Sequence, residues 1–558
     1  MKKKLSLLIL LTLTTTANSF GQTWSWAKSA GGTPFDWASS VTSDASGDII
    51  AVGSYLSPTI TFGSITLLNT NGFADMFILK YDSAGNVLWA KTYGGSYYDY
   101  PFCVTADASG NIIVAGDFDS PTITFGSTTL TSVGSGDMFI VKYDAAGNVL
   151  WAKSAGGADD YDHARSVTTD SLGNIIAVGY FKSADITFGS TTLLNVSNNN
   201  LEDIFIVKYD AAGNVLWAKS AGGNYGDAAY SVTADAAGNI IAAGIFYSTT
   251  LTFGSTTLTN ANAGNYDDIF IVKYDSAGNV LWAKSAGGIA NDVAYAVTTD
   301  PSGNIIAAGY FLSASITFDS STFLNAGGSD MFIVKYDTAG NVLWAKSAGG
   351  TSNDGAIAIT TDASGNIIAT GSFYGTITFG STTLSSAGEA DIFIVKYDTA
   401  GNVTWANSAG GIGYDSPSSI TADASGNIIA AGDFASSTLT FGSTTLTNAG
   451  GYDMFVAKLG TILSTGINDI PASRSTTGIF PNPFSGSTTI SFSLEQSQNV
   501  SLRIFDMNGR LVTTLADAYF EEGDHEIVWN TENLNPGIYF LRFQSAENSE
   551  TVRLAVTN

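Results

Sequence analysis

The sequence is poor in residues that several common kinds of site require. It has one cysteine, Cys103, so no disulfide can form within the chain. Only two histidines are present, and a histidine-based metal centre is therefore implausible. The 23 basic residues are outnumbered by 49 acidic ones, which gives a net charge of −26. Nucleic acids and anionic membrane surfaces attract basic patches, so neither is expected as a partner.

Long apolar runs are also absent after the N-terminus. Lys2–Lys4 form a basic start, Leu5–Leu13 form a short apolar stretch, and Ser19 and Gly21 fit the small residues of a cleavage site. Residues 1–21 are therefore predicted to be a secretory signal peptide. No other run approaches the length that a membrane-spanning helix needs, so no transmembrane segment is expected in the mature chain.

A tryptophan recurs at one register along most of the chain. The seven members are Trp26, Trp89, Trp151, Trp217, Trp282, Trp344 and Trp405, and their spacings are 63, 62, 66, 65, 62 and 61 residues. A repeat of this length is typical of a propeller or a solenoid. At 558 residues the chain is also too long for one ordinary hydrophobic core.

Each repeat contains four strand-like runs, here named a, b, c and d. One set is SVTTD (166–170), NIIAVGYF (174–181), DIFIVKYD (203–210) and NVLWAKS (214–220). The a–b and c–d connections are tight DxxGN turns, in which Asp accepts local hydrogen bonds and Gly-Asn supplies positive φ values. Four antiparallel strands per repeat predict an all-β fold built from propeller blades.

The two ends of the array are complementary halves of one repeat. The first is TWSWAKS, a d strand with no c strand before it, and the last is DMFVAKL, a c strand with no d strand after it. Pairing these two strands would complete seven blades and remove two exposed sheet edges. We therefore predict a seven-bladed β-propeller over residues 22–460, closed by its N-terminal and C-terminal strands.

The repeats are similar to SBBP-type β-propeller repeats. The resemblance rests on the 60-odd-residue period and on segments such as DASGNIIVAG (107–116) and FIVKYDAAGNVLWAKSAGG (139–157), and it covers residues 23–460. It implies an architecture but no activity, because that family has no common function.

The d–a and b–c connections share one face, and the b–c segments vary in length, so any binding is expected there. Seven aspartates lie in the d–a loops on that face, and seven others open the c strands. The first set is Asp36, Asp99, Asp162, Asp227, Asp292, Asp354 and Asp415. Carboxylates could form a calcium ring, but a structural role in every blade is the favoured interpretation. No other cofactor is indicated.

Two residue types in the c and d strands are given structural roles. The lysines of the IVK and WAK registers are expected on exposed outer hairpins, where they prevent pairing with other chains. The seven tryptophans beside them are expected to pack in the core or at the outer rim, and sugar stacking is the alternative.

Symmetry is broken at GGADDYDHARSV (156–167), which contains Asp162, His163 and Arg165. These three residues form the candidate ligand-binding spot, although a solvated ion-pair cluster is the favoured interpretation. No catalytic residues are predicted, since neither a GxSxG motif nor a Ser-His-acid arrangement occurs. A pair of glycosidase carboxylates stays open, because such pairs are recognised by distance rather than by spacing.

The composition changes after Gly460. Residues 461–478 read as a linker, and residues 479–558 contain short alternating strands that predict a small Ig-like β-sandwich. This segment resembles the type A C-terminal sorting domain of the type IX secretion system, through PNPF (481–484), VSLRIFDMNGRLV (500–512) and LNPGIYFLRF (534–543). The resemblance implies export across the outer membrane of a Gram-negative bacterium, with the secretion machinery as partner, followed by removal of the domain.

Three functions fit these features. The first is a secreted or surface-attached, non-catalytic binding or adhesion module that recognises an extracellular protein or glycan. The second is a glycan-active hydrolase or lyase that uses carboxylates on the loop-rich face. The third is a structural component of a surface coat. A monomer is expected in each case.

Overall fold

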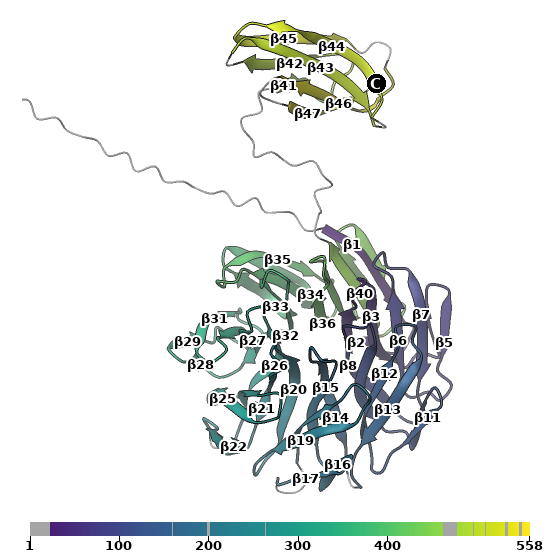
Figure 1. Cartoon of the computed structure of the whole chain (residues 1–558), viewed down its shortest axis with the longest axis vertical. Coiled ribbons are helices and arrows are strands. Elements are labelled where there is room, and N and C mark those ends of the chain that lie inside the picture. Colours follow the sequence, from purple (N-terminus) through teal and green to yellow (C-terminus); the bar gives the residue numbers. More distant parts are fainter. Residues whose placement is uncertain are drawn as a thin grey trace, which may run out of the picture. The chain divides into compact units, whose positions relative to one another are not determined.

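The computed structural model describes residues 23–158, 160–197, 201–262, 264–460, 477–494, 496–507, 509–530, 534–545 and 549–557 (Figure 1). The chain divides into two compact units, Met1–Ile462 and Leu463–Asn558. The predicted signal peptide and residues 461–476 of the predicted linker lie outside the described residues. All regular elements in the described residues are β-strands, which confirms the prediction of an all-β chain.

The first unit contains seven four-stranded antiparallel sheets, each in the order a-b-c-d. The a strands are β2 (Asp36–Ser43), β8 (Asp99–Ala106), β14 (Asp162–Thr169), β20 (Asp227–Ala234), β26 (Asp292–Thr299), β32 (Asp354–Thr361) and β36 (Asp415–Ala422). The b strands are β3 (Ile49–Tyr55), β9 (Ile112–Phe118), β15 (Ile175–Phe181), β21 (Ile240–Phe246), β27 (Ile305–Phe311), β33 (Ile367–Phe379) and β37 (Ile428–Phe434).

The other two strands complete each sheet on its outer side. The c strands are β6 (Asp75–Tyr81), β12 (Asp137–Tyr143), β18 (Asp203–Tyr209), β24 (Asp268–Tyr274), β30 (Asp330–Tyr336), β34 (Thr382–Tyr397) and β40 (Asp453–Gly460). The d strands are β7 (Val87–Tyr93), β13 (Val149–Ala155), β19 (Val215–Ala221), β25 (Val280–Ala286), β31 (Val342–Ala348), β35 (Val403–Ala409) and β1 (Thr23–Ala30).

The seventh sheet combines the two ends of the array. Its order is β36-β37-β40-β1, and β1 pairs antiparallel with β40 from Thr23 opposite Gly460 to Ala30 opposite Met454. The seven a strands surround the centre of the array in Figure 1, and each contacts the a strand of the next sheet. The contact between β36 and β2 joins the last of these strands to the first. The sheets are separate, and no closed sheet occurs in the part of the chain that the structure describes.

The hydrophobic core lies between neighbouring sheets. Each of seven clusters joins the b and c strands of one sheet to those of the next, with the intervening a strand. One cluster joins Ile429 and Val456 of the last sheet to Ile49 and Phe77 of the first. Because both faces of the b and c strands are covered, these strands are apolar almost throughout.

A two-stranded hairpin extends the b–c connection, where the sequence predicted a long variable loop. Six repeats have it as separate strands: β4 (Thr59–Phe62) with β5 (Ile65–Leu68), β10 (Thr122–Phe125) with β11 (Thr128–Thr131), β16 (Asp185–Phe188) with β17 (Thr191–Leu194), β22 (Thr250–Phe253) with β23 (Thr256–Thr259), β28 (Ser315–Phe318) with β29 (Ser321–Leu324), and β38 (Thr438–Phe441) with β39 (Thr444–Thr447). In the sixth repeat the hairpin is continuous with β33 and β34. Its apolar residues, such as Ile60 and Phe62, are buried and contact the core of the neighbouring sheet pair. Most of this segment is therefore scaffold.

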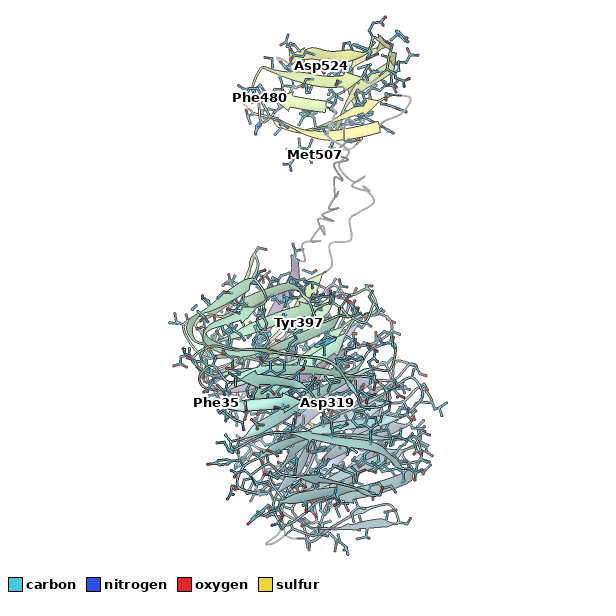
Figure 2. All side chains as sticks on the ribbon, turned by 90° about the vertical axis from the view of Figure 1, so that its left-hand side faces the viewer. Phe35, Asp319, Tyr397, Phe480, Met507 and Asp524 are labelled. Atoms are coloured by element: carbon cyan, nitrogen blue, oxygen red, sulfur yellow. The ribbon has the colours of Figure 1, made fainter. Side chains whose placement is uncertain are left out.

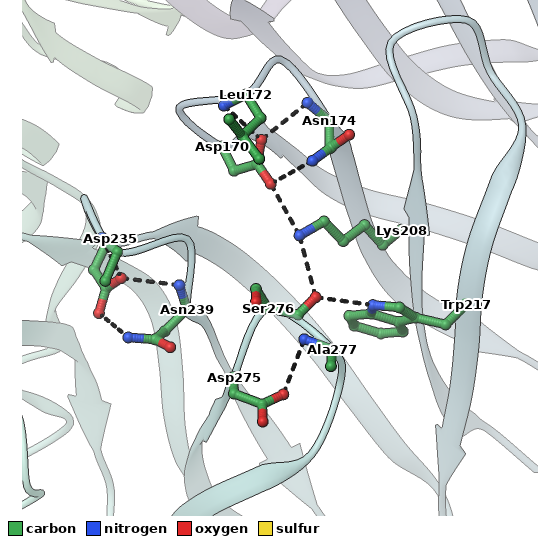
Figure 3. Close-up of polar contacts among 11 residues, drawn as sticks. Asp170, Leu172, Asn174, Lys208, Trp217, Asp235, Asn239, Asp275, Ser276 and Ala277 are labelled. Atoms are coloured by element: carbon green, nitrogen blue, oxygen red, sulfur yellow. Dashed lines mark hydrogen bonds and ion pairs between the residues drawn. The ribbon is translucent and has the colours of Figure 1, made fainter.

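Six of the seven c-strand lysines are buried and Lys396 is half-buried, so their predicted exposure is wrong. The d-strand lysines of the WAK register are exposed or half-buried. Lys208 lies 2.9 Å from Asp170 of the a–b turn in its own sheet, and its Nζ donates to the Ser276 carbonyl in the c–d turn of the next sheet (Figure 3). The indole Nε1 of Trp217 donates to the same carbonyl at 3.3 Å. Equivalent lysine–aspartate pairs occur in all seven sheets, with N–O distances from 2.8 to 3.1 Å. Each pair lies within one sheet. In six of the sheets the paired lysine also donates to a backbone carbonyl in the c–d turn of the next sheet, at 3.3–3.5 Å, and so fastens the two sheets together.

The last sheet is fastened to the first in the same way. Lys458 and Trp26 both donate to the Ser83 carbonyl, each at 3.3 Å. The backbone N–H of Val41 in β2 donates to Ser419 Oγ in β36, as Val104 does to Ser40 between β8 and β2.

The second unit has two antiparallel sheets that share one hydrophobic core. The three-stranded sheet is β41 (Thr477–Phe480), β42 (Ser487–Leu494) and β45 (Gly523–Asn530). The four-stranded sheet is β44 (Leu511–Phe520), β43 (Gln498–Asp506), β46 (Gly537–Gln544) and β47 (Ser549–Val556). Trp529 and Leu541 are buried in the shared core, whereas Phe480 is 82 % exposed (Figure 2).

Candidate functional site

The first aspartate set lies at the first residue of each a strand and is fully buried. Asp36 Oδ2 accepts hydrogen bonds from Ser57 Oγ at 2.5 Å and from the Gly32 backbone N–H at 2.8 Å. Five further sheets repeat the bond to serine, through Asp99, Asp162, Asp227, Asp292 and Asp415. In the remaining sheet, Asp354 accepts from the backbone N–H groups of Gly350 and Tyr374. Each carboxylate thus joins its d–a loop to the b–c connection.

Burial raises the pKa of these carboxyl groups. The pKa of Asp99, Asp227 and Asp354 rises to about 7, and hydrogen bonds lower it only in part. No group of three or more His, Cys, Asp or Glu side chains placed to hold a metal ion occurs among the described residues. A calcium ring made of these aspartates stays a prediction, while their hydrogen bonds supply the structural role.

Two consecutive glycines stand in every d–a loop. The second aspartate set, at the start of the c strands, explains why the first of these glycines has no side chain. A Cβ on Gly222 would overlap the carboxylate of Asp203, and the first glycine of every other pair meets its own aspartate in the same way. Six of these aspartates have a buried Oδ1 without a hydrogen-bond partner: Asp75, Asp203, Asp268, Asp330, Asp391 and Asp453. Burial raises the pKa of Asp203 to about 7.

The structure separates the three residues of the predicted ligand-binding spot. Asp162 is directed into the fold, where it accepts from Gly157 N and Ser183 Oγ. His163 Nδ1 lies 3.2 Å from Asp117 Oδ1 of the preceding sheet, without hydrogen-bond alignment. The Arg165 guanidinium stacks on two aromatic rings, Phe102 at 4.5 Å and Tyr230 at 5.6 Å. The expected solvated ion-pair cluster is therefore not what the described residues form.

His163 and Arg165 belong to a set of variable positions on the a strands. The second residue is Trp37, Tyr100, His163, Ala228, Val293, Gly355 or Ser416, and the fourth is Ser39, Phe102, Arg165, Tyr230, Tyr295, Ile357 or Ser418. Other positions of the a strands hardly vary. In every repeat the first residue is Asp, the third is Ala or Pro, and the sixth is Val or Ile. Sequence reasoning missed this pattern, which a position-by-position comparison of the repeats would have found.

The variable positions bring aromatic side chains together across the first five sheets. Trp37 and Tyr100 have ring centroids 6.0 Å apart, and Phe102 lies 6.0 Å from His163. Further along, the rings of Tyr230 and Tyr295 are stacked at 5.8 Å. The sixth and seventh sheets have only Gly, Ile and Ser at these positions. At these positions the centre of the array is therefore aromatic on one side and without aromatic rings on the other.

A pocket of about 490 Å³ opens on the aromatic side. It is lined by Trp37, Tyr100, Phe102, Asp117, Asp119, Tyr161 and His163, which come from the first three sheets. Burial, followed by the charge of Asp117, raises the pKa of Asp119 to about 6, and His163 partly opposes this shift. The volume and the mixture of aromatic walls with a few polar groups are typical of small-ligand sites.

The fold and its repeats define the class first: an all-β repeat protein whose four-stranded sheets fit a β-propeller. The C-terminal unit is more specific, because residues 478–557 match the family model "Secretion system C-terminal sorting domain". The prediction of a sorting domain is thereby confirmed, and it implies export by the type IX system to the cell surface or the medium. None of the described residues forms a helix long and apolar enough to cross a membrane.

Two proteins are similar to the chain in sequence. An uncharacterized WD repeat-containing protein of Acanthamoeba polyphaga mimivirus is 27 % identical over 531 residues, which cover 78 % of this chain and 38 % of that protein. Regulatory protein FlaEY of Caulobacter vibrioides is 26 % identical over 159 residues, which cover 27 % of this chain and 16 % of that protein. The chain therefore spans less than half the length of both relatives.

Among solved structures, a glycoside hydrolase family 43 arabinoxylan arabinofuranohydrolase from Bacillus subtilis, solved in complex with cellotetraose, aligns with 70 % of this chain and 95 % of its own. The identity is 11 % and the TM-score is 0.24. A likeness this weak carries no argument about function.

Proposed function

We propose that residues 22–460 are a closed seven-bladed β-propeller of the SBBP type, acting as a non-catalytic binding module outside the cell. The sorting domain of residues 479–558 delivers it. Support for closure comes from the β1–β40 pairing and from the repeated lysine, tryptophan and serine contacts between the last and first sheets.

One observation carries the binding role. The repeats keep the residues that fasten the sheets and differ at the a-strand positions around the centre of the array. A purely structural coat component has no physical need for a Trp, Tyr, Phe and His cluster on one side of that centre. A ligand does need such asymmetry, because it contacts only some of the repeats.

A glycan-active hydrolase is the second candidate, because Asp117 and Asp119 share one pocket and Asp119 has a raised pKa. Two carboxyl groups in one pocket, one of them with a raised pKa, are the pairing that glycosidases use. The divergence at the variable positions fits this candidate as well.

One experiment separates these roles. The purified full chain is incubated with a glycan array, with bacterial and host cells, and with soluble polysaccharides, and both bound protein and new reducing ends are measured. Saturable binding without product supports the binding module. Release of reducing ends supports the hydrolase, and absence of both contradicts the proposed function.

A further inference from the structure

The pocket between the first three sheets combines two features that point to one class of ligand. Its walls are partly exposed aromatic rings, among which Tyr161 is 39 % exposed. It also contains buried carboxylate oxygens that accept no hydrogen bond among the described residues. The inference below rests on the proposed binding function and names the ligand class.

The aromatic rings form a row rather than a cage. Tyr100 and Phe102 are inclined by 26° at 6.3 Å, and Tyr161 and His163 by 12° at 6.0 Å. Trp37 is inclined by 34° to Tyr100. Trp37 and Tyr161 each have one ring neighbour among the described residues, so each has a second face that can receive a flat, weakly polar surface such as the C–H face of a pyranose. A compact cation would instead need walls on several sides.

The buried carboxylate oxygens at the base accept no hydrogen bond within the described part of the chain. Asp117 is 1 % exposed, and its Oδ1 lies 3.2 Å from His163 Nδ1 without hydrogen-bond alignment. Asp119 Oδ1 is also buried and accepts no hydrogen bond from any described residue. Buried polar atoms without partners are costly and uncommon in proteins. Hydroxyl groups of a bound sugar would donate to these carboxylate oxygens and remove that cost.

The charge of the pocket selects among sugars. Two carboxylates stand at its base, so a uronic acid or another anionic sugar would be repelled. A cation is less suited, because one aromatic face that could receive it is already covered by the chain's own Arg165 guanidinium, 4.5 Å from the Phe102 ring. A neutral sugar satisfies both conditions.

We propose that the pocket lined by Trp37, Tyr100, Phe102, Tyr161, Asp117 and Asp119 binds a neutral pyranose residue of an extracellular glycan. The sugar stacks on the aromatic row and donates hydroxyl hydrogen bonds to the two carboxylates. Sheets six and seven do not take part, because Gly355, Ile357, Ser416 and Ser418 stand at the equivalent positions.

The repeats supply a matched control for a test of this site. Tyr161 and Tyr414 each stand directly before the first aspartate of an a strand, but Tyr161 lines the pocket and Tyr414 does not. We expect Tyr161→Ala and Trp37→Ala each to weaken sugar binding roughly tenfold, as loss of a stacking face does. Tyr414→Ala should leave the affinity within about twofold. Asp117→Asn keeps the side-chain volume and should also weaken binding.

The measurement is calorimetry of the full chain with neutral tetrasaccharides of glucose, mannose, galactose, xylose and N-acetylglucosamine. A galacturonic acid tetrasaccharide and tetramethylammonium are the comparison probes, and a thermal melt shows that each variant is folded. Binding of a neutral sugar that is weakened in Tyr161→Ala, Trp37→Ala and Asp117→Asn, but not in Tyr414→Ala, supports the site.

Three outcomes overturn it: neutral sugars bind equally to all variants, no neutral sugar binds, or only tetramethylammonium or the galacturonic acid probe binds. The proposed binding function fails separately, when the full chain binds no cell, protein or glycan at all.

Discussion

Two sets of positions in the same repeats follow opposite rules. Every a–b turn keeps Asp and Gly, and every c strand keeps Lys. The lysine pairs with the a–b turn of its own sheet and, in six sheets, donates to the c–d turn of the next sheet. At the second and fourth residues of the a strands, the seven repeats contain aromatic, basic, aliphatic and hydroxyl side chains. The difference teaches that the contacts between sheets and the variable positions at the centre of the array use separate residues of each repeat, so one set can change while the other is kept.

Deletion of the N-terminal strand β1 should disrupt the contacts between sheets most strongly. Deleting Thr23–Ala30 from the full chain leaves β40 unpaired and removes Trp26 from its contact with Ser83. We expect the melting temperature to fall by more than about 10 °C, since a whole edge strand and its part of the core are lost. An unchanged melt would contradict the closure proposed above.

Replacing a single buried lysine should have the next largest effect on stability. Lys208→Met leaves Asp170 buried without its cation, and we expect about 3 kcal/mol of lost stability in chemical denaturation. Lys219→Met is the matched control, because Lys219 is exposed on the adjacent strand, and it should change stability by less than about 0.5 kcal/mol. The double variant Asp170→Asn with Lys208→Met should recover part of the loss. If Lys208→Met and Lys219→Met lowered the stability equally, the role of Lys208 in fastening the sheets would be refuted.

Substitution of two nearby glycines contrasts an invariant position with a variable one. Gly349 is the first glycine of a d–a loop pair, and Gly355 is the second residue of the a strand β32. In Gly349→Ala the new Cβ would overlap the Asp330 carboxylate, so we expect a loss of about 1–3 kcal/mol. In Gly355→Ala the nearest atom is 3.5 Å away, and other repeats have larger side chains there, so the change should stay within about 0.5 kcal/mol. Denaturant titration of both variants measures the difference. A loss of stability in Gly355→Ala as large as that in Gly349→Ala would show that the variable positions are also constrained by folding.

The buried aspartates predict an unusual dependence of stability on pH. In the folded state Asp203 and Asp227 keep their protons up to about pH 7, whereas an unfolded aspartate loses its proton near 4. The folded state therefore binds more protons between pH 7 and 4, and stability rises by several degrees of melting temperature as the pH falls through that window.

Below this window the trend should reverse. The pKa of Asp170 is lowered, because its bonds to Asn174 and Lys208 outweigh the effect of burial, so protonation there breaks the fastening pair. Thermal melts from pH 8 to 3 measure both branches, and Asp203→Asn should reduce the rise. A melt that falls steadily from pH 7 to 4 would contradict the raised pKa values.

The repeating architecture could be predicted from the sequence because each strand and each turn is formed by a contiguous segment. The DxxGN turns, the apolar b and c strands and the sorting domain are all contiguous segments, and each could be recognised alone. The outer hairpin was missed because TITFGSTTL alternates over few residues around a glycine and resembles a polar loop. In the structure Gly63 has φ +59° and makes the hairpin turn, and in the fifth repeat Asp319 replaces this glycine at φ +50° (Figure 2).

The candidate site could not be predicted in full, because its residues are distant in the sequence. Trp37 and Tyr100 stand one repeat apart, as do Phe102 and His163, and only the packing of neighbouring a strands brings the two rings of each pair together. Burial of Lys208 likewise depends on the turn of the following sheet. His163 and Arg165 were noticed for their rarity, but their surroundings required the structure.

The pairing of β1 with β40 also sets an order of events during synthesis. The first strand leaves the ribosome more than 400 residues before its partner, whose last residue is Gly460. At the usual speed of translation this delay is roughly 20–90 s. Throughout that time the first strand has no partner from its own sheet, and a chain truncated before Asp453 would never supply one.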